Sequence, residues 1–286
     1  MKDRNAADWE ELAQREPYFA VLTHDDLLGV QSSDVATTGF FETGEADIAS
    51  LLAAIASVRG REIPLTSALD FGCGVGRLTL PLARRAERVV ACDIAPTMLA
   101  HARQNAEGAG LHNVTYIENH ELDVLPGDSF DFICSLLVLQ HIPPSAGYAI
   151  IRTLLRVLAP GGIAALHLTF ERPGGGLRRL ARAARAKSRF VHRAVSAMRH
   201  ENLGLPYMQM NEYDERILQR DVEAAGARIV SRFPTRHGDT SGAVLVIEKR
   251  LGSTGRSSRE RSPHPPSAPS PLAEGRRLPN STQREI

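Results

Sequence analysis

From residue 64 onward, apolar runs of strand length alternate with stretches in which apolar side chains recur at helical spacing. The apolar runs predict strands at 67–71, 88–93, 114–118, 130–136 and 162–170. The helical spacing predicts helices at 77–85, 96–109 and 145–158. The crossover at 119–129 is short and predicts little helix. Alternation of this kind is typical of a parallel sheet covered by helices.

The segments on either side of this region have different patterns. An apolar face around Trp9 is interrupted by Pro17, a longer helix precedes Gly60, and the aromatic segment 38–44 predicts a turn between them. We therefore expect residues 1–60 to form a helical N-terminal cap.

The C-terminal half changes character after the fifth predicted strand. Residues 172–199 carry nine Arg or Lys and no acid, with apolar residues at helical spacing. A helix at 213–225 and two strand-like runs at 227–233 and 241–249 follow. We expect a basic helical insertion over 172–212 before this last helix.

Length and charge set the limits of the main domain. A chain of 286 residues with net charge +1 fits one large domain or two small ones. Residues 251–286 contain seven Ser and six Pro and predict a disordered tail without assigned function. Residues 1–250 then carry 28 basic and 30 acidic side chains, which argues against a dedicated nucleic-acid binder.

The cysteines and the N-terminal residues indicate in which cellular compartment the protein works. Cys73, Cys92 and Cys134 are far apart and predict neither a metal site nor a redox pair. The polar start of the chain leads to no signal-peptide core, and no apolar run is long enough to span a membrane. We expect a cytoplasmic protein.

The first predicted strand ends in a glycine loop, Asp70-Phe71-Gly72-Cys73-Gly74-Val75-Gly76-Arg77. Glycines at alternate positions let a ligand lie directly on the main chain. The G-x-G-x-G spacing is not the G-x-G-x-x-G of dinucleotide-binding folds, so a nicotinamide-dependent dehydrogenase is the weaker alternative. The chain also contains no phosphate loop of the G-x-x-x-x-G-K-[ST] type.

An acid followed by this loop resembles motif I of the class I S-adenosylmethionine-dependent methyltransferases, and the resemblance covers about residues 64–250. It implies a doubly wound, seven-stranded, mostly parallel Rossmann-like sheet over 61–250, ending in an antiparallel strand pair. It also implies S-adenosylmethionine as the cofactor and no metal. The insertion lies where relatives place a substrate-covering lid; a lid is favoured over a solvated helix face, and both over a peripheral membrane contact through 172–199.

The resemblance assigns cofactor contacts residue by residue. The glycine loop would hold the methionine end of the cofactor, through Asp70, Phe71, Gly72, Gly74 and Gly76. An acid at the end of the second strand, about 20 residues past the glycines, can accept both ribose hydroxyls.

In this sequence that acid is Asp93, and Ile94 would flank the adenine. At the end of the third strand, Asn119 and the backbone N–H of His120 would bind the adenine edge, where many relatives have an acid. Glu118 and Asp123 remain alternatives for that role.

The fourth strand and the turn after it would lie beside the reacting methyl group. Ser135 ends the strand, and His141 follows in the turn, either as a general base or as a packed side chain. His167 is interpreted as structural. Arg77 contacts either an anion in the pocket or a partner on the helix surface.

The acceptor is expected to be a small molecule of the kind that bacterial enzymes of this class methylate on oxygen, nitrogen or carbon. The fourth-strand region has neither the Asn/Asp-Pro-Pro-Tyr motif of base amino methylation nor a Pro-Cys nucleophile, since Cys134 falls within the strand. An RNA methyltransferase, suggested by the basic segment, and a non-catalytic cofactor-binding subunit remain the alternatives.

Overall fold

The computed structural model describes residues 4–30, 35–171, 204–237 and 240–251. The strands are β1 (Ser67–Phe71), β2 (Arg88–Asp93), β3 (Val114–Glu118), β4 (Phe130–Ser135), β5 (Leu158–Glu171), β6 (Ala227–His237) and β7 (Thr240–Lys249). The helices are α1 (Arg4–Arg15), α2 (Pro17–Val21), α3 (Val35–Arg59), α4 (Thr79–Ala83), α5 (Pro96–Gly108), α6 (Pro144–Val157) and α9 (Glu215–Ala224). Short 3-10 helices are η1 (Asp25–Leu27), η2 (Asn119–Val124) and η3 (Leu139–His141).

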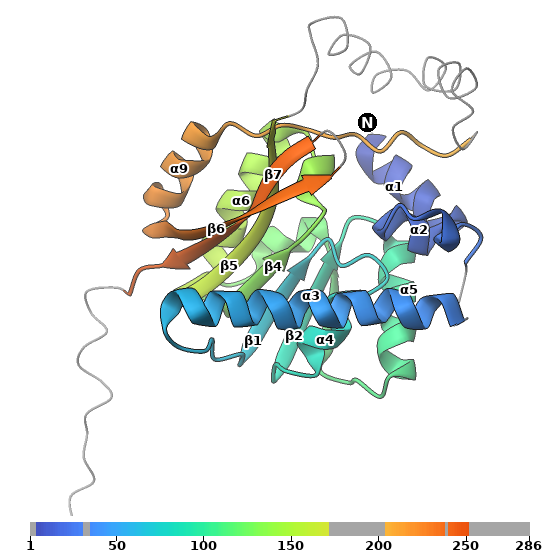
Figure 1. The fold of residues 1–286 in the computed structure, drawn as a ribbon, viewed down its shortest axis with the longest axis horizontal. Helices are drawn as coiled ribbons and strands as arrows, with labels where there is room; N and C mark the ends of the chain where they lie inside the picture. Colours follow the sequence, from blue (N-terminus) through green and yellow to red (C-terminus); the bar gives the residue numbers. More distant parts are fainter. Residues whose placement is uncertain (1–3, 31–34, 172–203, 238–239, 252–286) are drawn as a thin grey trace, which may run out of the picture. The chain divides into compact units, whose positions relative to one another are not determined.

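The seven strands form one sheet in the order β3-β2-β1-β4-β5-β7-β6 (Figure 1). The pairs from β3 to β5 are parallel, and β7 runs antiparallel to both β5 and β6. This confirms the predicted doubly wound sheet with its final antiparallel pair. The carboxyl ends of β1, β2, β3 and β4 therefore meet at one edge, where ligands bind in such sheets.

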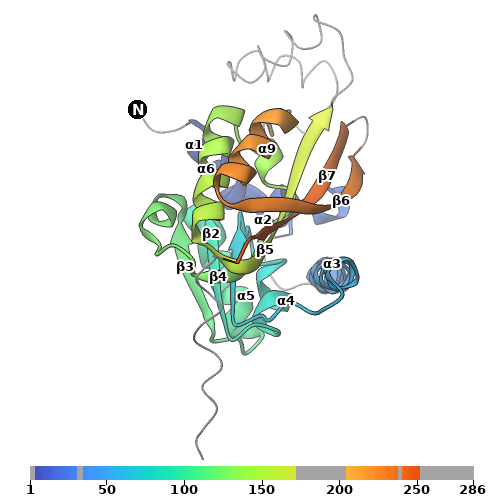
Figure 2. The ribbon, with the colours of Figure 1, turned by 90° about the vertical axis from the view of Figure 1, so that its left-hand side faces the viewer.

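The sheet is buried on both faces because its strand residues alternate between two hydrophobic layers. Leu69 and Ile133 point to the layer of α6 and α9, whereas Ala68 and Phe132 point to the layer of α3 and α4. Figures 1 and 2 show these helices on opposite faces of the sheet.

The N-terminal cap differs from the expectation in one element. Segment 38–44, expected as an aromatic turn, lies inside the 25-residue helix α3, so that prediction is wrong. Gly44 is required by a close approach and not by a turn, since a Cβ there would lie 2.1 Å from the backbone oxygen of Arg77. Helix α3 packs on the sheet through Ile48 and Ile55, and α1 and α2 form a separate apolar cluster at its carboxyl edge.

The fifth strand begins earlier than the sequence predicts. Helix α6 ends at Val157, and β5 starts at Leu158 in place of residue 162. Pro160 disfavours helical geometry in the residue before it, which ends the helix. A register shift between Phe130 and Phe132 accommodates the extra residues of β5.

Most of the expected insertion (172–212) and of the expected tail (251–286) lies outside the described residues, at 172–203 and 252–286. Residues 204–212 of the insertion form neither helix nor strand, in contrast to the helical expectation. Residues 204–214, which lead to α9, are called the strap below. In Figure 1 the strap runs from the side of α1 and α2 to α9. No helix in the described ranges is long and apolar enough to cross a membrane.

Glu248 of β7 joins three elements at the opposite, amino end of the sheet. Its carboxylate accepts hydrogen bonds from Arg59 Nη2 at 3.0 Å and from Arg228 Nη2 at 2.8 Å, and Arg59 also donates to Gly161 O. Burial raises the pKa of Glu248, but the two arginines outweigh burial and the net shift is downward. Glu248 therefore stabilises the fold above its unfolded pKa, and this contribution is lost as pH falls through the folded pKa.

We expect Glu248→Gln to lower the free energy of unfolding by about 1–3 kcal/mol at pH 7, because the Arg59 guanidinium keeps a buried donor without a charged acceptor. The difference from wild type should shrink as pH falls below 4.5, the ordinary glutamate pKa. Urea unfolding at several pH values measures it, with the exposed Glu62→Gln as the matched control. A loss of unfolding free energy in Glu248→Gln that does not depend on pH would contradict the ion-pair explanation.

Candidate functional site

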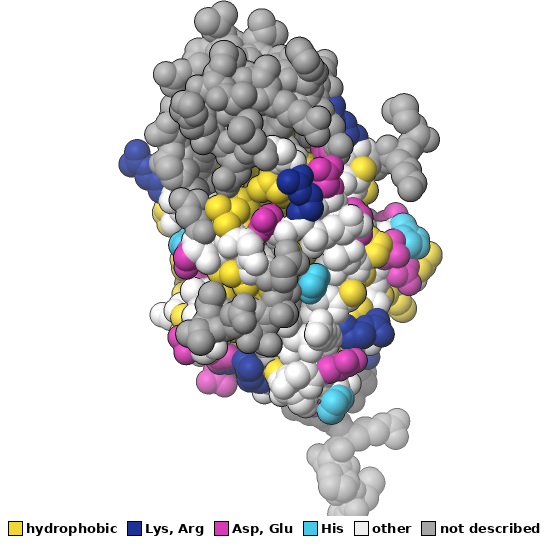
Figure 3. Space-filling view, turned by 90° about the vertical axis from the view of Figure 1, so that its right-hand side faces the viewer, with side chains coloured by type: hydrophobic (Ala, Val, Ile, Leu, Met, Phe, Trp, Pro, Cys, Tyr) yellow, Lys and Arg dark blue, Asp and Glu magenta, His cyan; other side chains and the backbone are white. Residues whose placement is uncertain are grey.

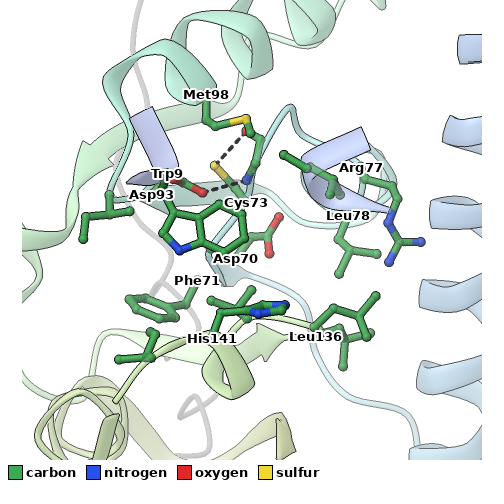
Figure 4. A pocket seen from close by; sticks show the side chains of 18 of the residues that line it. Trp9, Asp70, Phe71, Cys73, Arg77, Leu78, Asp93, Met98, Leu136 and His141 are labelled. Atoms are coloured by element: carbon green, nitrogen blue, oxygen red, sulfur yellow. Dashed lines mark hydrogen bonds between the residues drawn. The ribbon is translucent and has the colours of Figure 1, made fainter. Parts of the chain in front are cut away.

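A pocket opens at the carboxyl edge of the sheet, between β1, β2, β4 and the cap. The space not filled by atoms in and around it, open solvent included, is about 780 Å³. Its walls come from the glycine loop, the starts of α4 and α5, Asn119, the turn after β4, and residues of α1 and α2. Figure 4 shows the side chains around it.

The glycine loop is held by hydrogen bonds to the end of β2. The N–H groups of Gly72 and Cys73 donate to Cys92 O at 2.7 and 3.0 Å. All three loop glycines have positive φ, between 52° and 92°. A Cβ on Gly72 would lie 2.4 Å from Val138, and one on Gly74 would lie 2.5 Å from Val21. The loop therefore needs glycine for its conformation and for the close approach of the turn and the cap.

Asp93 ties the loop to α5. Its Oδ2 accepts the N–H of Gly74 at 2.9 Å, and its Oδ1 accepts the N–H of Ala95 at 3.0 Å. Burial raises the pKa of the Asp93 carboxyl, and the backbone N–H donors offset part of that rise. A carboxylate offers about four lone-pair sites, so Asp93 keeps acceptor capacity for ligand hydroxyl groups beside these donors and the Ile94 N–H.

Asp70 lies at the end of β1 and is 1% exposed. Its Oδ2 accepts the hydroxyl of Thr79 at 2.6 Å. Burial raises the pKa of the Asp70 carboxyl to about 6, although Thr79 and the Arg77 guanidinium act in the opposite direction. A buried carboxylate of this kind favours a cationic partner at neutral pH.

The other predicted cofactor residues divide into two groups. Phe71, Ile94 and Asn119 line the pocket, and Asn119 Oδ1 accepts only a weak Cys92 S–H contact at 3.3 Å. Ser135 is fully buried and does not line it. The His120 side chain is exposed beside Glu118, so only its backbone N–H, as predicted, is a candidate contact.

His141 lines the pocket from η3 and contacts three neighbours. Its Nδ1 lies 2.6 Å from Gln209 O of the strap, and its Nε2 lies 3.2 Å from the side-chain nitrogen of Gln140. The imidazole meets the Trp9 indole edge-on, with 5.3 Å between ring centroids. Burial lowers the pKa of His141 to about 4, with the Gln209 hydrogen bond opposing. The general-base role stays a prediction, and both ring nitrogens already have partners.

Arg77 and His167 have partners within the protein. Arg77 is 3% exposed and binds Asp47 of α3 at 2.6 Å, while its Nε has no hydrogen-bond partner. His167 is buried between the Leu137 N–H and the Thr235 hydroxyl, which fits the structural role predicted for it. Leu137 itself has a φ of 63°, and its N–H bond to His167 helps to hold this turn.

The turn after β4, expected beside the reacting methyl group, lines the pocket through Leu136, Leu137 and Val138. The contact between Gln209 O and His141, which are 68 residues apart in the chain, was not found from the sequence. This contact depends on the tertiary fold and leaves no local signal. Trp9 of the N-terminal cap also lines the pocket.

Residues 68–162 match the family described as a methyltransferase domain. A ubiquinone biosynthesis O-methyltransferase of Methylobacterium sp. (strain 4-46) is 36% identical over 95 residues, covering 33% of this chain and 37% of that protein. A 23S rRNA (uracil(1939)-C(5))-methyltransferase of Salmonella choleraesuis is 51% identical over 57 residues, covering 20% of this chain and 13% of its own. This chain thus spans well under half of the length of these relatives.

Among solved structures, the magnesium protoporphyrin IX methyltransferase of Synechocystis PCC 6803 with bound S-adenosylhomocysteine has a TM-score of 0.52. It is 20% identical, and the match covers 86% of this chain and 95% of that one. Together with the sheet order, these matches confirm the resemblance seen in the sequence. Residues 68–162 match the methyltransferase-domain family, and the sheet around them has the class I methyltransferase fold.

We expect Gly72→Ala to destabilise the fold more than Gly60→Ala. Both glycines have similar positive φ, which costs a residue with a Cβ about 1–2 kcal/mol. Only at Gly72 does the added Cβ meet another side chain, that of Val138, while Gly60 has open space. The contact with Val138 should lower the free energy of unfolding of Gly72→Ala by a further ~1–3 kcal/mol.

The double variant Gly72→Ala/Val138→Ala should recover the contact part of this loss and leave the backbone part. Urea unfolding of the four proteins, wild type included, measures both. Equal losses for Gly72→Ala and Gly60→Ala would show that the loop does not need the close approach.

Proposed function

We propose that the protein is an S-adenosylmethionine-dependent methyltransferase that transfers a methyl group to oxygen, nitrogen or carbon of a small molecule. The observation that carries the proposal is the glycine loop clamped to Asp93 at the sheet edge, inside the matched methyltransferase region. The cofactor is a sulfonium ion with an activated methyl group, and the protein supplies its binding and alignment.

The pocket residues fit this cofactor. Asp93 keeps acceptor capacity for the ribose hydroxyls, and Ile94 and Asn119 stand beside it to contact the adenine. Asp70 would hold the cationic ammonium group, which offsets the cost of keeping that carboxylate ionised in a buried position. Binding at both ends fixes the direction in which the methyl group points.

Methyl transfer is an in-line displacement. A lone pair of the acceptor forms the new bond to the methyl carbon while the carbon–sulfur bond breaks and its electron pair stays on sulfur. The role of this chain is to align the acceptor with that bond and to keep water away. The turn after β4 and Trp9 of the cap form the wall at which we place the acceptor.

The similarity to an rRNA methyltransferase keeps an RNA substrate as the second candidate. Cys134 argues against pyrimidine C5 chemistry, because it is fully buried in β4 and burial raises the pKa of its thiol. Figure 3 shows acidic, basic and hydrophobic side chains intermixed on the described surface of one face, without a broad basic area. The small-molecule acceptor is therefore preferred.

Calorimetric titration of S-adenosylhomocysteine into the full chain tests the proposal. We expect micromolar binding to wild type and at least about tenfold weaker binding to Asp93→Ala, since hydrogen bonds to a charged group are worth about 1.5–3 kcal/mol each. Asp93→Asn, which keeps one acceptor oxygen, should fall between them. Glu87→Gln, at an exposed carboxylate outside the pocket, is the control. Failure of folded wild type to bind would refute the cofactor assignment.

The affinity for S-adenosylhomocysteine should rise with pH through about 6, the pKa of Asp70, because only the carboxylate attracts the ligand ammonium. Asp70→Asn should bind more weakly above pH 6 and lose this pH dependence.

The same raised pKa means that the protonated Asp70 stabilises the free protein at low pH, and that this stability is lost as pH rises from 3.8 through about 6. Unfolding experiments should then find Asp70→Asn more stable than wild type above pH 6. An identical pH dependence in both proteins would contradict this assignment.

A further inference from the structure

The part of the pocket built by the cap and the turn after β4 differs in chemistry from the part built by β1 and β2. Among the described residues, the charged side chains lining the pocket are Asp70, Asp93 and Arg77, from the ends of β1 and β2 and the loop before α4. The turn contributes Leu136 to Val138, His141 and Ile142, and α1 contributes Trp9 and Asn5. The described residues of this part of the wall favour an uncharged ligand, because none of them carries a charge that could pair with a charged group buried there.

The hydrogen bonds of His141 fix its protonation. A backbone carbonyl only accepts, so Nδ1, 2.6 Å from Gln209 O, carries the proton. The Gln140 side chain then donates its amide N–H to the lone pair of Nε2. The opposite orientation of Gln140 would place an oxygen there and require a doubly protonated, charged ring. Burial lowers the pKa of His141 to about 4 and so disfavours that charged ring, which leaves a neutral imidazole whose lone pair faces the Gln140 amide.

The neutral ring forms an aromatic wall with Trp9. Their planes meet at 65° with the centroids 5.3 Å apart, an edge-to-face arrangement of the kind that aromatic pairs prefer. In Figure 4 the two rings project into the same region of the pocket from different elements. Gln209 O of the strap and Gln140 of the turn hold the imidazole in this orientation. The wall therefore depends on three segments that are distant in sequence.

We propose that this wall takes a flat, uncharged, apolar acceptor, and that His141 orients the acceptor rather than removing a proton from it. Any proton on the accepting atom stays on the methylated product and is lost to solvent when the product is released, since Gln140 occupies the one lone pair of the ring. The inference rests on the proposed function, because it assigns the acceptor side of the same pocket. The low pKa of His141, about 4, agrees with it, and no charged side chain contributes to that shift.

Two probes of the same shape test the acceptor class: neutral 2-naphthamide and anionic 2-naphthoate, titrated by calorimetry into the full chain saturated with S-adenosylhomocysteine. The amide should bind at least about tenfold more tightly than the carboxylate, because the wall offers no partner for a buried charge. Equal or tighter binding of 2-naphthoate, or binding of neither probe, overturns the proposal. If S-adenosylhomocysteine itself does not bind, the proposed function fails instead, so the two failures are distinct.

The role of His141 is tested with two variants. His141→Phe keeps a flat ring and should retain 2-naphthamide binding within about threefold, whereas His141→Ala should lose at least about tenfold. Binding of S-adenosylhomocysteine and the unfolding midpoint of each variant show whether the fold is intact. If a folded His141→Phe protein loses 2-naphthamide binding, the proposal that the flat ring at this position forms the acceptor wall is wrong.

Trp9 is the single tryptophan of the chain, so its fluorescence reports on the neighbouring ring. A protonated imidazole quenches indole fluorescence. Between pH 8 and 5.5 the emission should show no transition that depends on His141, because the ring stays neutral. A transition near pH 6.5 that disappears in His141→Phe but persists in the exposed control His112→Gln would overturn the inference.

Discussion

The hydrogen bond from the Gly74 N–H to Asp93 joins the ends of two neighbouring strands, and the geometry of the pocket depends on it. The N–H groups of Gly72 and Cys73 turn back to Cys92 O of β2, so the loop lies flat against the next strand. Asp93 completes this arrangement and also caps the chain before α5 through the Ala95 N–H. One buried carboxylate therefore positions both the loop and the first turn of the helix that follows.

The close packing of this loop leaves no room for a side chain at Gly72 or Gly74. Val138 and Val21 approach Gly72 and Gly74 so closely that any Cβ would collide with them, which brings the turn after β4 and the cap to the same loop. The cap is held there by its own apolar cluster, which includes Val75 of the loop and Met98 of α5. The burial that keeps water out also raises the pKa of Asp70 and lowers that of His141. The burial produced by this close packing is therefore also the main cause of the pKa shifts in the site.

The sequence predicts those parts of the structure that depend on local pattern. Strand and helix periodicity predicts the sheet, and the spacing from Asp70 to Asp93 predicts which two acids meet at its edge. Gly44 shows where local pattern is insufficient. Glycine beside aromatic residues is typical of a turn, but here a neighbouring backbone oxygen requires it within a helix. The Gln209 contact and the left-handed Leu137 were not predictable for the same reason, because each depends on residues brought together only by the fold.

The pocket has a cofactor side and an acceptor side, and sequence similarity says more about the cofactor than about the acceptor. The matched region, residues 68–162, contains the loop, Asp93 and Asn119, which together form the proposed cofactor side. Trp9 and Gln209 lie outside that region, and they contact His141 from the cap and the strap. The names of the relatives therefore carry information about methyl transfer and little about the acceptor. The acceptor class has to be inferred from the wall itself, where an uncharged imidazole, an indole and apolar side chains favour a flat, neutral molecule.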